Sequence, residues 1–192
     1  MDSKLRGHVI CLDYDPRWKS EFKRVQTYLS SLLQDQIIGV EHVGSTSVAG
    51  CAAKPILDID LVIDSESDFH AVKKTLEQAG YIHRGDQGIE GREVFKRLFE
   101  DEFMAYHLYV CTKVSKELLR HLSLKMYLAD HPEVVIAYSN LKKELARSYP
   151  YSIQDYIDGK DAFIKKMLAD LDEQGYLIQN YRNSSVNRVG KD

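Results

Sequence analysis

The chain is poor in cysteine, has no long hydrophobic run and carries no excess of basic residues. Its three cysteines, Cys11, Cys51 and Cys111, are odd in number and widely spaced along the 192 residues. This spacing favours buried free thiols in a reducing compartment over a disulfide framework, and over a metal site, which would need closer pairs. We therefore expect a cytoplasmic protein.

The absence of long apolar segments excludes two further classes. No stretch approaches the roughly 20 apolar residues needed to cross a bilayer, and the first residues lack the apolar run of a signal peptide. The net charge of −3, from 26 Lys and Arg against 29 Asp and Glu, argues against a broad nucleic-acid-binding surface but leaves room for a small basic pocket. We therefore expect no membrane partner and no extended nucleic-acid surface.

Hydrophobic periodicity predicts a mixed α/β (α+β) half followed by a helical half. Strands are expected at residues 8–12, 37–43, 56–63, 93–99 and 104–111, the last two paired around an acidic turn at residues 100–102. Helices are expected at residues 17–33, 69–79, 115–128, 132–145 and 153–172. We interpret residues 1–114 as an α/β core, residues 115–182 as C-terminal helices packed on it within the same domain, and residues 183–192 as a disordered tail.

Asp58 and Asp60 stand out on the clearest of these strands. They are two residues apart, so their carboxylates share one face, roughly 7 Å from each other. Two carboxylates on one face suit a hard divalent cation, Mg²⁺ or Mn²⁺, which also bridges to substrate phosphates. The alternative is an edge strand with one solvated face; Ile56 and Val62 make the same face apolar on either side and argue against it.

Gly44 and Ser45 end the preceding strand and are followed by Thr46. A glycine lets backbone amides approach an anion closely, and a serine hydroxyl adds a donor, so both suit a phosphate group. A Gly-Ser pair alone usually marks only a turn. Its weight here comes from its position, one short connection before the strand with Asp58 and Asp60.

A Gly-Ser turn followed by two aspartates on the next strand resembles the nucleotidyltransferase superfamily. More closely, EHVGSTSVAG at residues 41–50 and AKPILDID at residues 53–60 are similar to the GrpB family within that superfamily. Shorter matches follow in YDPRW (14–18), HLYV (107–110), YLADHPE (127–133), YSNLK (138–142) and KDAFI (160–164), so the resemblance covers roughly residues 8–170. It implies a nucleotidyltransferase-like mixed sheet with flanking helices and a helical C-terminal part.

Two departures from the pattern of active transferases stand beside this resemblance. Such enzymes normally add a third carboxylate on a later strand, where this chain offers His107 and Tyr109. The family's usual Arg-Asp pair before the Tyr-Leu of the first C-terminal helix is replaced by Lys125 and Met126, and Ala129 stands where a second arginine is common. These missing charges weaken the expectation of tight phosphate binding and of two-metal catalysis.

The remaining candidates each have a structural alternative. His107 either contacts a metal or phosphate or is an ordinary structural histidine. His42 either orients the Gly-Ser turn or makes a structural hydrogen bond, and Lys54 either neutralises a phosphate or is solvated. Lys142 and Lys160 lie on predicted helices, where an exposed side chain is the usual state.

These residues predict a metal-dependent nucleotidyltransferase that acts on a nucleoside triphosphate and an acceptor that the sequence does not identify. Asp58 and Asp60 would hold Mg²⁺ or Mn²⁺, and deprotonation of the acceptor would fall to His107 or to the acceptor's own chemistry. The expected nucleotide contacts come from the turn and its neighbours: His42, Gly44, Ser45, Thr46 and Lys54.

Two other functions fit the same pocket. One is a non-catalytic module that binds a nucleotide or phosphorylated small molecule, which the missing third carboxylate favours; the other is a different phosphate-ester reaction such as hydrolysis. The chain has 12 tyrosines, several of them in predicted helices far along the chain from the Asp strand. We therefore do not assign them to a nucleobase site.

Overall fold

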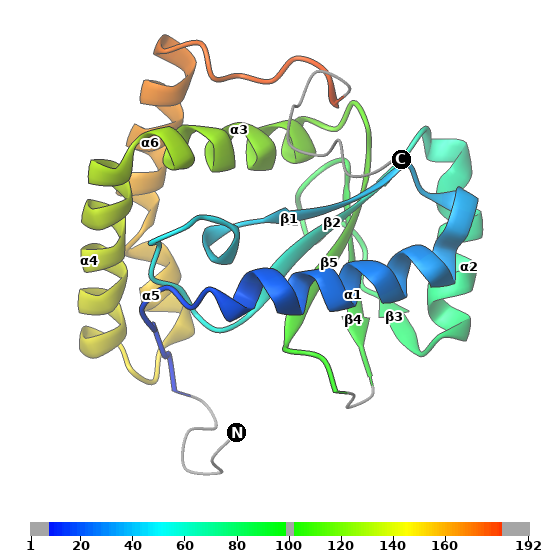
Figure 1. Cartoon of the computed structure of the whole chain (residues 1–192), viewed down its shortest axis with the longest axis horizontal. Helices are drawn as coiled ribbons and strands as arrows, with labels where there is room; N and C mark the ends of the chain where they lie inside the picture. The colour runs from blue at the N-terminus through cyan, green and yellow to red at the C-terminus, as the bar shows by residue number, and fades with distance from the viewer. Residues whose placement is uncertain (1–7, 99–101, 182–192) are drawn as a thin grey trace.

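The computed structural model of the chain describes residues 8–98 and 102–181 (Figure 1). Five strands form one sheet in the order β1-β2-β5-β4-β3. Their bounds are β1 Gly39–Val43, β2 Leu57–Ile63, β3 Tyr81–His83, β4 Arg92–Arg97 and β5 Tyr106–Thr112. Strand β2 is parallel to β5, whereas the other neighbouring pairs are antiparallel. The sheet is therefore mixed, which confirms the expected fold class.

Strand β2 lies inside the sheet, between β1 and β5. Asp58 pairs in register with Val43 and His107, and Asp60 pairs with Glu41 and Tyr109. The interpretation of this strand as a solvated edge is therefore wrong, because both of its sides carry hydrogen-bonded neighbours.

One face of the sheet carries the main hydrophobic core, beneath α1 (Arg17–Leu33) and α2 (Phe69–Gln78). Figure 1 shows α1 crossing in front of the strands. The helix forms as its periodicity predicts, because its apolar side chains recur every three or four residues and are all buried: Trp18, Phe22, Val25, Leu29 and Leu33. The alternating residues of β2 that point away from Asp58 and Asp60 meet this layer: Leu57, Ile59, Leu61 and Ile63.

The opposite face, which carries the two aspartates, is partly covered by α3 (Lys116–Asp130). Leu118 and Leu122 of α3 pack on Val43, Val62 and Cys111. Helices α4 (Pro132–Ser148), α5 (Ile153–Asp158) and α6 (Asp161–Glu173) lie beside the connection between β1 and β2 (Figure 1). The described residues also contain three short 3-10 helices: η2 Gln34–Gln36, η3 Ser45–Ser47 and η4 Glu66–Asp68.

Two predicted elements differ in the structure. Residues 8–12 form no strand but an isolated bridge between Leu12 and Ala53, because this segment finds partners at Ala53 and Pro150 rather than along one strand. The single helix predicted for residues 153–172 is two helices, α5 and α6, which meet at Gly159 and Lys160. Gly159 lies so close to Leu145 of α4 that a Cβ there would require the leucine side chain to move.

The structure also bears on the expectations for the cysteines, for membrane-spanning helices and for two predicted segments. Cys11, Cys51 and Cys111 are free thiols; Cys51 and Cys111 are buried, whereas Cys11 is partly exposed. Between residues 8 and 98 and between 102 and 181, no helix has both the length and the apolar character that a membrane span requires. Most of the predicted acidic turn, residues 100–101, and the predicted tail, residues 183–192, lie outside the described residues.

Candidate functional site

The turn at Gly44 is built against the carboxylate of Asp58. Gly44 has φ +68°, a left-handed conformation, and a Cβ at this position would overlap the Asp58 side chain. The backbone then enters η3, whose Ser47 hydroxyl donates to the Gly44 carbonyl at 2.7 Å. Glycine is therefore required here both by the backbone conformation and by the close approach to Asp58.

Asp58 pairs with the imidazole of His107 on the neighbouring strand. His107 Nδ1 lies 3.0 Å from Asp58 Oδ1, and the side chains are 47% and 32% exposed. The pair is therefore accessible to a ligand. The structure brings together two residues that the sequence singled out on separate strands.

Asp60, two residues further along β2, is fully buried. Its Oδ2 lies 2.8 Å from His121 Nδ1 on α3, and His121 Nε2 lies 3.4 Å from Glu117 Oε1 one helical turn earlier. Burial alone would lower the pKa of His121, but the neighbouring Asp60 and Glu117 carboxylates outweigh it and raise the pKa to about 9. Asp60 Oδ1, by contrast, is buried without a hydrogen-bond partner among the described residues.

His121 and Glu117 were not singled out from the sequence. Their spacing of four residues on a predicted helix is the signal that they share one face and can act together. The sequence gives no sign, however, that this face meets Asp60.

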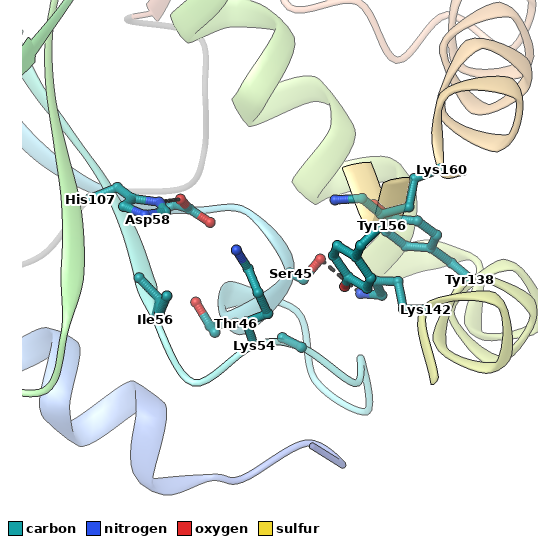
Figure 2. A pocket seen from close by; sticks show the side chains of 11 residues that line it. Ser45, Thr46, Lys54, Ile56, Asp58, His107, Tyr138, Lys142, Tyr156 and Lys160 are labelled. Carbon is teal, nitrogen blue, oxygen red and sulfur yellow. Dashed lines mark hydrogen bonds and ion pairs between the residues drawn. The ribbon is translucent and has the colours of Figure 1, made fainter. Parts of the chain in front are cut away.

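A pocket of about 90 Å³ lies in front of Asp58 (Figure 2). The sheet half contributes to its lining Ser45, Thr46, Lys54, Asp58 and His107, all of them predicted site residues. The helical half contributes Tyr138, Lys142, Tyr156 and Lys160. We call it the lysine pocket, after Lys54, Lys142 and Lys160 in its lining. Three other predicted residues, His42, Gly44 and Asp60, do not line it.

Lys142 is the most buried cation of the lysine pocket, with 2% of its surface exposed. Its Nζ donates to Ser45 Oγ at 2.9 Å and to Cys51 Sγ at 3.2 Å, and lies 4.1 Å from the centroid of the Tyr138 ring. Burial lowers the pKa of Lys142. The exposed side chain expected of a helical lysine is therefore wrong here, and Lys142 instead links α4 to the Gly-Ser turn.

Lys160 stands at the junction of α5 and α6 with its ammonium over the Tyr156 ring, 4.6 Å from the centroid. Burial and the nearby charges of Lys54 and Lys142 lower the pKa of Lys160 to about 8. Figure 2 shows Lys54 and Lys160 directed into the space between Asp58 and Ser45. The Lys54 and Lys142 ammonium groups thus repel that of Lys160, which lines the pocket with them.

Tyr138 and Tyr156 form the far wall of the lysine pocket, and both are almost fully buried. The sequence interpretation set the tyrosines of the helical half apart from the site because of their distance along the chain. The structure corrects this, since α4 and α5 carry these two rings to the Gly-Ser turn.

His42 makes structural contacts next to the Gly-Ser turn. Its Nε2 lies 3.0 Å from Thr46 Oγ1, and its ring stacks on Phe22 with centroids 4.6 Å apart. Burial, with the nearby Lys125 ammonium, lowers the pKa of His42 to about 3, so the ring is neutral at pH 7. Lys125 Nζ also donates to the His42 carbonyl at 2.8 Å. His42 therefore orients the turn through Thr46, while Lys125 braces β1 instead of contacting the lysine pocket.

The donor set fits a divalent cation that arrives with a phosphate-bearing ligand. Asp58 is accessible and Asp60 Oδ1 is a buried oxygen without a partner among the described residues. Residues 8–98 and 102–181 hold no cluster of three or more His, Cys, Asp or Glu side chains that would bind a metal by themselves. Mg²⁺ commonly takes one or two carboxylates and completes its shell with water and substrate phosphates.

The fold is similar to that of nucleotidyltransferases. The solved GLD-2/RNP-8 complex superposes with a TM-score of 0.61 at 12% identity, covering 94% of this chain and 74% of that chain. The Cid1 poly(U) polymerase superposes with a TM-score of 0.50 at 10% identity, covering 72% of this chain and 42% of that chain. At these identities the likeness shows the fold alone.

The family model described as GrpB protein matches residues 8–170, and the chain belongs to the GrpB family. The crystal structure of the conserved protein GrpB from Enterococcus faecalis superposes with a TM-score of 0.77 at 32% identity, covering 87% of this chain and 99% of that chain. The glutamate-rich protein GrpB of Alkalihalophilus pseudofirmus is 30% identical over 169 residues, which are 86% of this chain and 97% of the relative. The YqkA protein of Bacillus subtilis is 33% identical over 152 residues, and the chain spans only 44% of its length.

Proposed function

We propose that this protein is a metal-dependent nucleotidyltransferase that moves a nucleotidyl group from a nucleoside triphosphate to an acceptor. The observation that carries the proposal is the division of charge across the lysine pocket. Asp58 stands on one side, and Lys54, Lys142 and Lys160 converge from the other (Figure 2). A triphosphate with a bound divalent cation matches both sides, because the cation is attracted to Asp58 and the phosphates are attracted to the lysines.

The lysines explain how the phosphates would be held. Burial and mutual repulsion lower the pKa of Lys160, so an anion between Lys160 and Lys54 relieves an unfavourable arrangement. Ser45 Oγ accepts a hydrogen bond from Lys142, which fixes this hydroxyl in the lining of the lysine pocket.

Asp58 and Asp60 would hold the metal, which supplies charge neutralisation for the phosphates. His121 keeps the Asp60 carboxylate fixed through Oδ2, while Oδ1 is buried and makes no hydrogen bond within the described residues. Such a partner behind a ligand sets the orientation of its carboxylate. The buried Asp60 therefore has the support that a metal ligand needs.

His107 is placed to take the proton of the acceptor. In the tautomer whose Nδ1 donates to Asp58, the ring's Nε2 is the accepting nitrogen. The acceptor's hydroxyl oxygen forms a bond to the α-phosphorus as the bond to pyrophosphate breaks, pyrophosphate leaves, and the hydroxyl proton moves to His107. This assignment fills the role left by the absent third carboxylate.

One observation favours a second function, a binding module without turnover. Tyr109, not a carboxylate, is the β5 residue paired with Asp60. Burial and the neighbouring Asp58 and Asp60 charges raise the pKa of Tyr109, so it stays neutral and adds no negative ligand. Nucleotide binding itself is common to both proposals, and a structure of Cid1, which shares this fold, is described as bound to MgATP.

The test compares thermal melts of the wild type and Asp58→Asn with Mg²⁺ or Mn²⁺ and each nucleoside triphosphate in turn. A ligand that binds only the folded state stabilises it, so we expect a rise of several degrees in the wild type with at least one nucleotide. Asp58→Asn should lose the rise, whereas Asp35→Asn, an exposed aspartate on η2, should keep it. Mass spectrometry of the same mixtures then separates transfer, which releases pyrophosphate, from binding alone.

A wild-type melt that no nucleotide shifts would count against both functions. Equal shifts in the wild type and Asp58→Asn would place the ligand elsewhere in the molecule. We also propose that the protein is cytoplasmic, as the wide spacing of its cysteines leads us to expect.

A further inference from the structure

A second hollow opens on the same face of the sheet, on the other side of His107. It has a volume of about 640 Å³ and is lined mainly by β4, β5 and the residues before β4. Its side chains include Arg84, Gln87, Lys96, His107 and Tyr109, and we call it the sheet pocket. His107 lines both this pocket and the lysine pocket, so the two spaces meet at the residue paired with Asp58.

The topology explains why this part of the sheet is open. Tyr109 is paired in register with Asp60 and with Val94, so all three lie on the aspartate-bearing face. Helix α3 covers that face only where Leu118 and Leu122 pack on Val43, Val62 and Cys111. The end of β5 that carries His107, with the adjoining end of β4, is left as the floor of the sheet pocket.

The charge of the sheet pocket is positive. Arg84, Lys96 and Arg97 line it, and none of its lining residues in the described chain is acidic. Arg84 and Lys96 are exposed and have no ion-pair partner among the described residues. Gln87 is one of two non-glycine residues with positive φ in the described chain, at +52°, and this uncommon backbone conformation presents its amide at the pocket rim.

We propose that the sheet pocket binds the acceptor, and that the acceptor is a small anionic molecule carrying a phosphate or carboxylate group beside its attacking hydroxyl. This inference rests on the proposed function, because it gives the transferred group its destination. The volume matches that of pockets for small molecules, about 300–1,000 Å³. A nucleoside is neutral and gains nothing from two unpaired cations, whereas an anion pairs with both.

The position of the sheet pocket next to His107 also fits the proposed transfer reaction. The nucleotide's phosphates lie with Lys54, Lys142 and Lys160, and the acceptor approaches from the opposite side of His107. Its hydroxyl oxygen bonds to the α-phosphorus, pyrophosphate leaves, and His107 takes the hydroxyl proton. Arg84 and Lys96 hold the anionic end of the acceptor away from the reacting phosphate.

The test is a backbone-amide NMR titration with inorganic phosphate, and separately with acetate, at constant ionic strength and without metal or nucleotide. We expect saturable shifts at the amides of Arg84, Gln87, Lys96 and His107. The double variant Arg84→Gln/Lys96→Gln should weaken this binding roughly tenfold or more, because charged hydrogen bonds are lost. The matched control Lys165→Gln/Lys166→Gln removes two exposed cations from α6 and should leave the titration unchanged.

The variants also separate this inference from the proposed function. Lys142→Met should remove the phosphate shifts at Ser45 and Lys54 and leave those at Arg84 and Lys96. Saturation by phosphate or by acetate supports the inference and identifies the anion's class. Shifts that rise linearly without saturation, equal losses in both double variants, or saturation by adenosine but by neither anion would overturn it, even if the Asp58-dependent nucleotide response is found.

Discussion

The Cα of Gly44 lies against the Asp58 side chain, so closely that a Cβ on Gly44 would come within 2.9 Å of Asp58 Cγ. The glycine of the Gly-Ser turn and the first aspartate of β2 are therefore one packed unit. An anion at the turn and a metal at Asp58 would be held by the same local geometry.

Gly44→Ala should disturb this unit, and Gly88→Ala is its matched control. Both glycines have positive φ, +68° and +81°, but a Cβ on Gly88 meets nothing within 4 Å. Both variants lose a positive-φ backbone that favours glycine, which costs roughly 1–3 kcal/mol, and at Gly44 the ψ of −173° lies in a region almost restricted to glycine. Gly44→Ala should lower the free energy of unfolding by about 1 kcal/mol more, because Asp58 has to move. Urea denaturation measures both, and equal losses would contradict the packing argument.

His121→Gln should change how stability depends on pH. The pKa of His121 is about 9 in the folded protein, against about 6.5 in the unfolded chain. The pairing with Asp60 and Glu117 therefore stabilises the fold fully below pH 6.5, and the contribution is lost as the pH rises to 9. The variant should be less stable than the wild type at pH 6, by up to about 3 kcal/mol, with a smaller difference at pH 9.5. Exposed His70→Gln is the control, and a pH-independent difference in His121→Gln would count against the ion pair.

Lys160→Met should show the opposite dependence. Burial and the nearby lysines lower the pKa of Lys160 to about 8, below its ordinary value of 10.5. Between pH 8 and 10.5 the unfolded chain binds more protons, so this lysine's unfavourable contribution is relieved as the pH rises. The stability of Lys160→Met minus that of the wild type should thus shrink from pH 7 to pH 10, and Lys165→Met should show no such trend. A flat difference would mean that Lys160 is solvated.

A chain that ends at residue 114 should not fold cooperatively. Val48 and Cys51, in the connection after the Gly-Ser turn, pack with Tyr127, Tyr138 and Met167 of the helical half. The Ala52 amide also donates to Ser139 Oγ at 2.9 Å. Removal of the helices exposes this apolar cluster and frees a buried amide. A sharp thermal transition in the shortened chain would show that the helices are a separate domain.

Local sequence patterns predicted four of the five strands of the described sheet, all except the short β3, and the position of Asp58 on β2. The alternation in β2 indicated which residues face the core, and Pro132 and Ser115 marked helix starts that the structure shows within one residue. Residues 8–12 were misleading because a short apolar run is compatible with a strand or with an extended segment that crosses a loop.

The helical wall of the site could not be predicted in the same way. Lys142 and Ser45 are 97 residues apart, and His121 and Asp60 are 61 residues apart. Each of these contacts depends on how α3 and α4 are placed on the sheet, and helical periodicity specifies only which side of a helix is apolar. A lysine on such a helix is usually solvated, so the burial of Lys142 becomes visible only when the Gly-Ser turn is next to it.

The acidic and the helical basic groups that line the lysine pocket come from different parts of the chain: Asp58 from β2, Lys142 and Lys160 from the helical half that follows. Substitutions among α4, α5 and α6 can therefore alter the anion that is held while the carboxylates keep their positions. We expect the anion specificity of GrpB relatives to diverge first in these helices. A chimera that exchanges residues 115–182 between two relatives should carry the specificity of the relative that donates the helices.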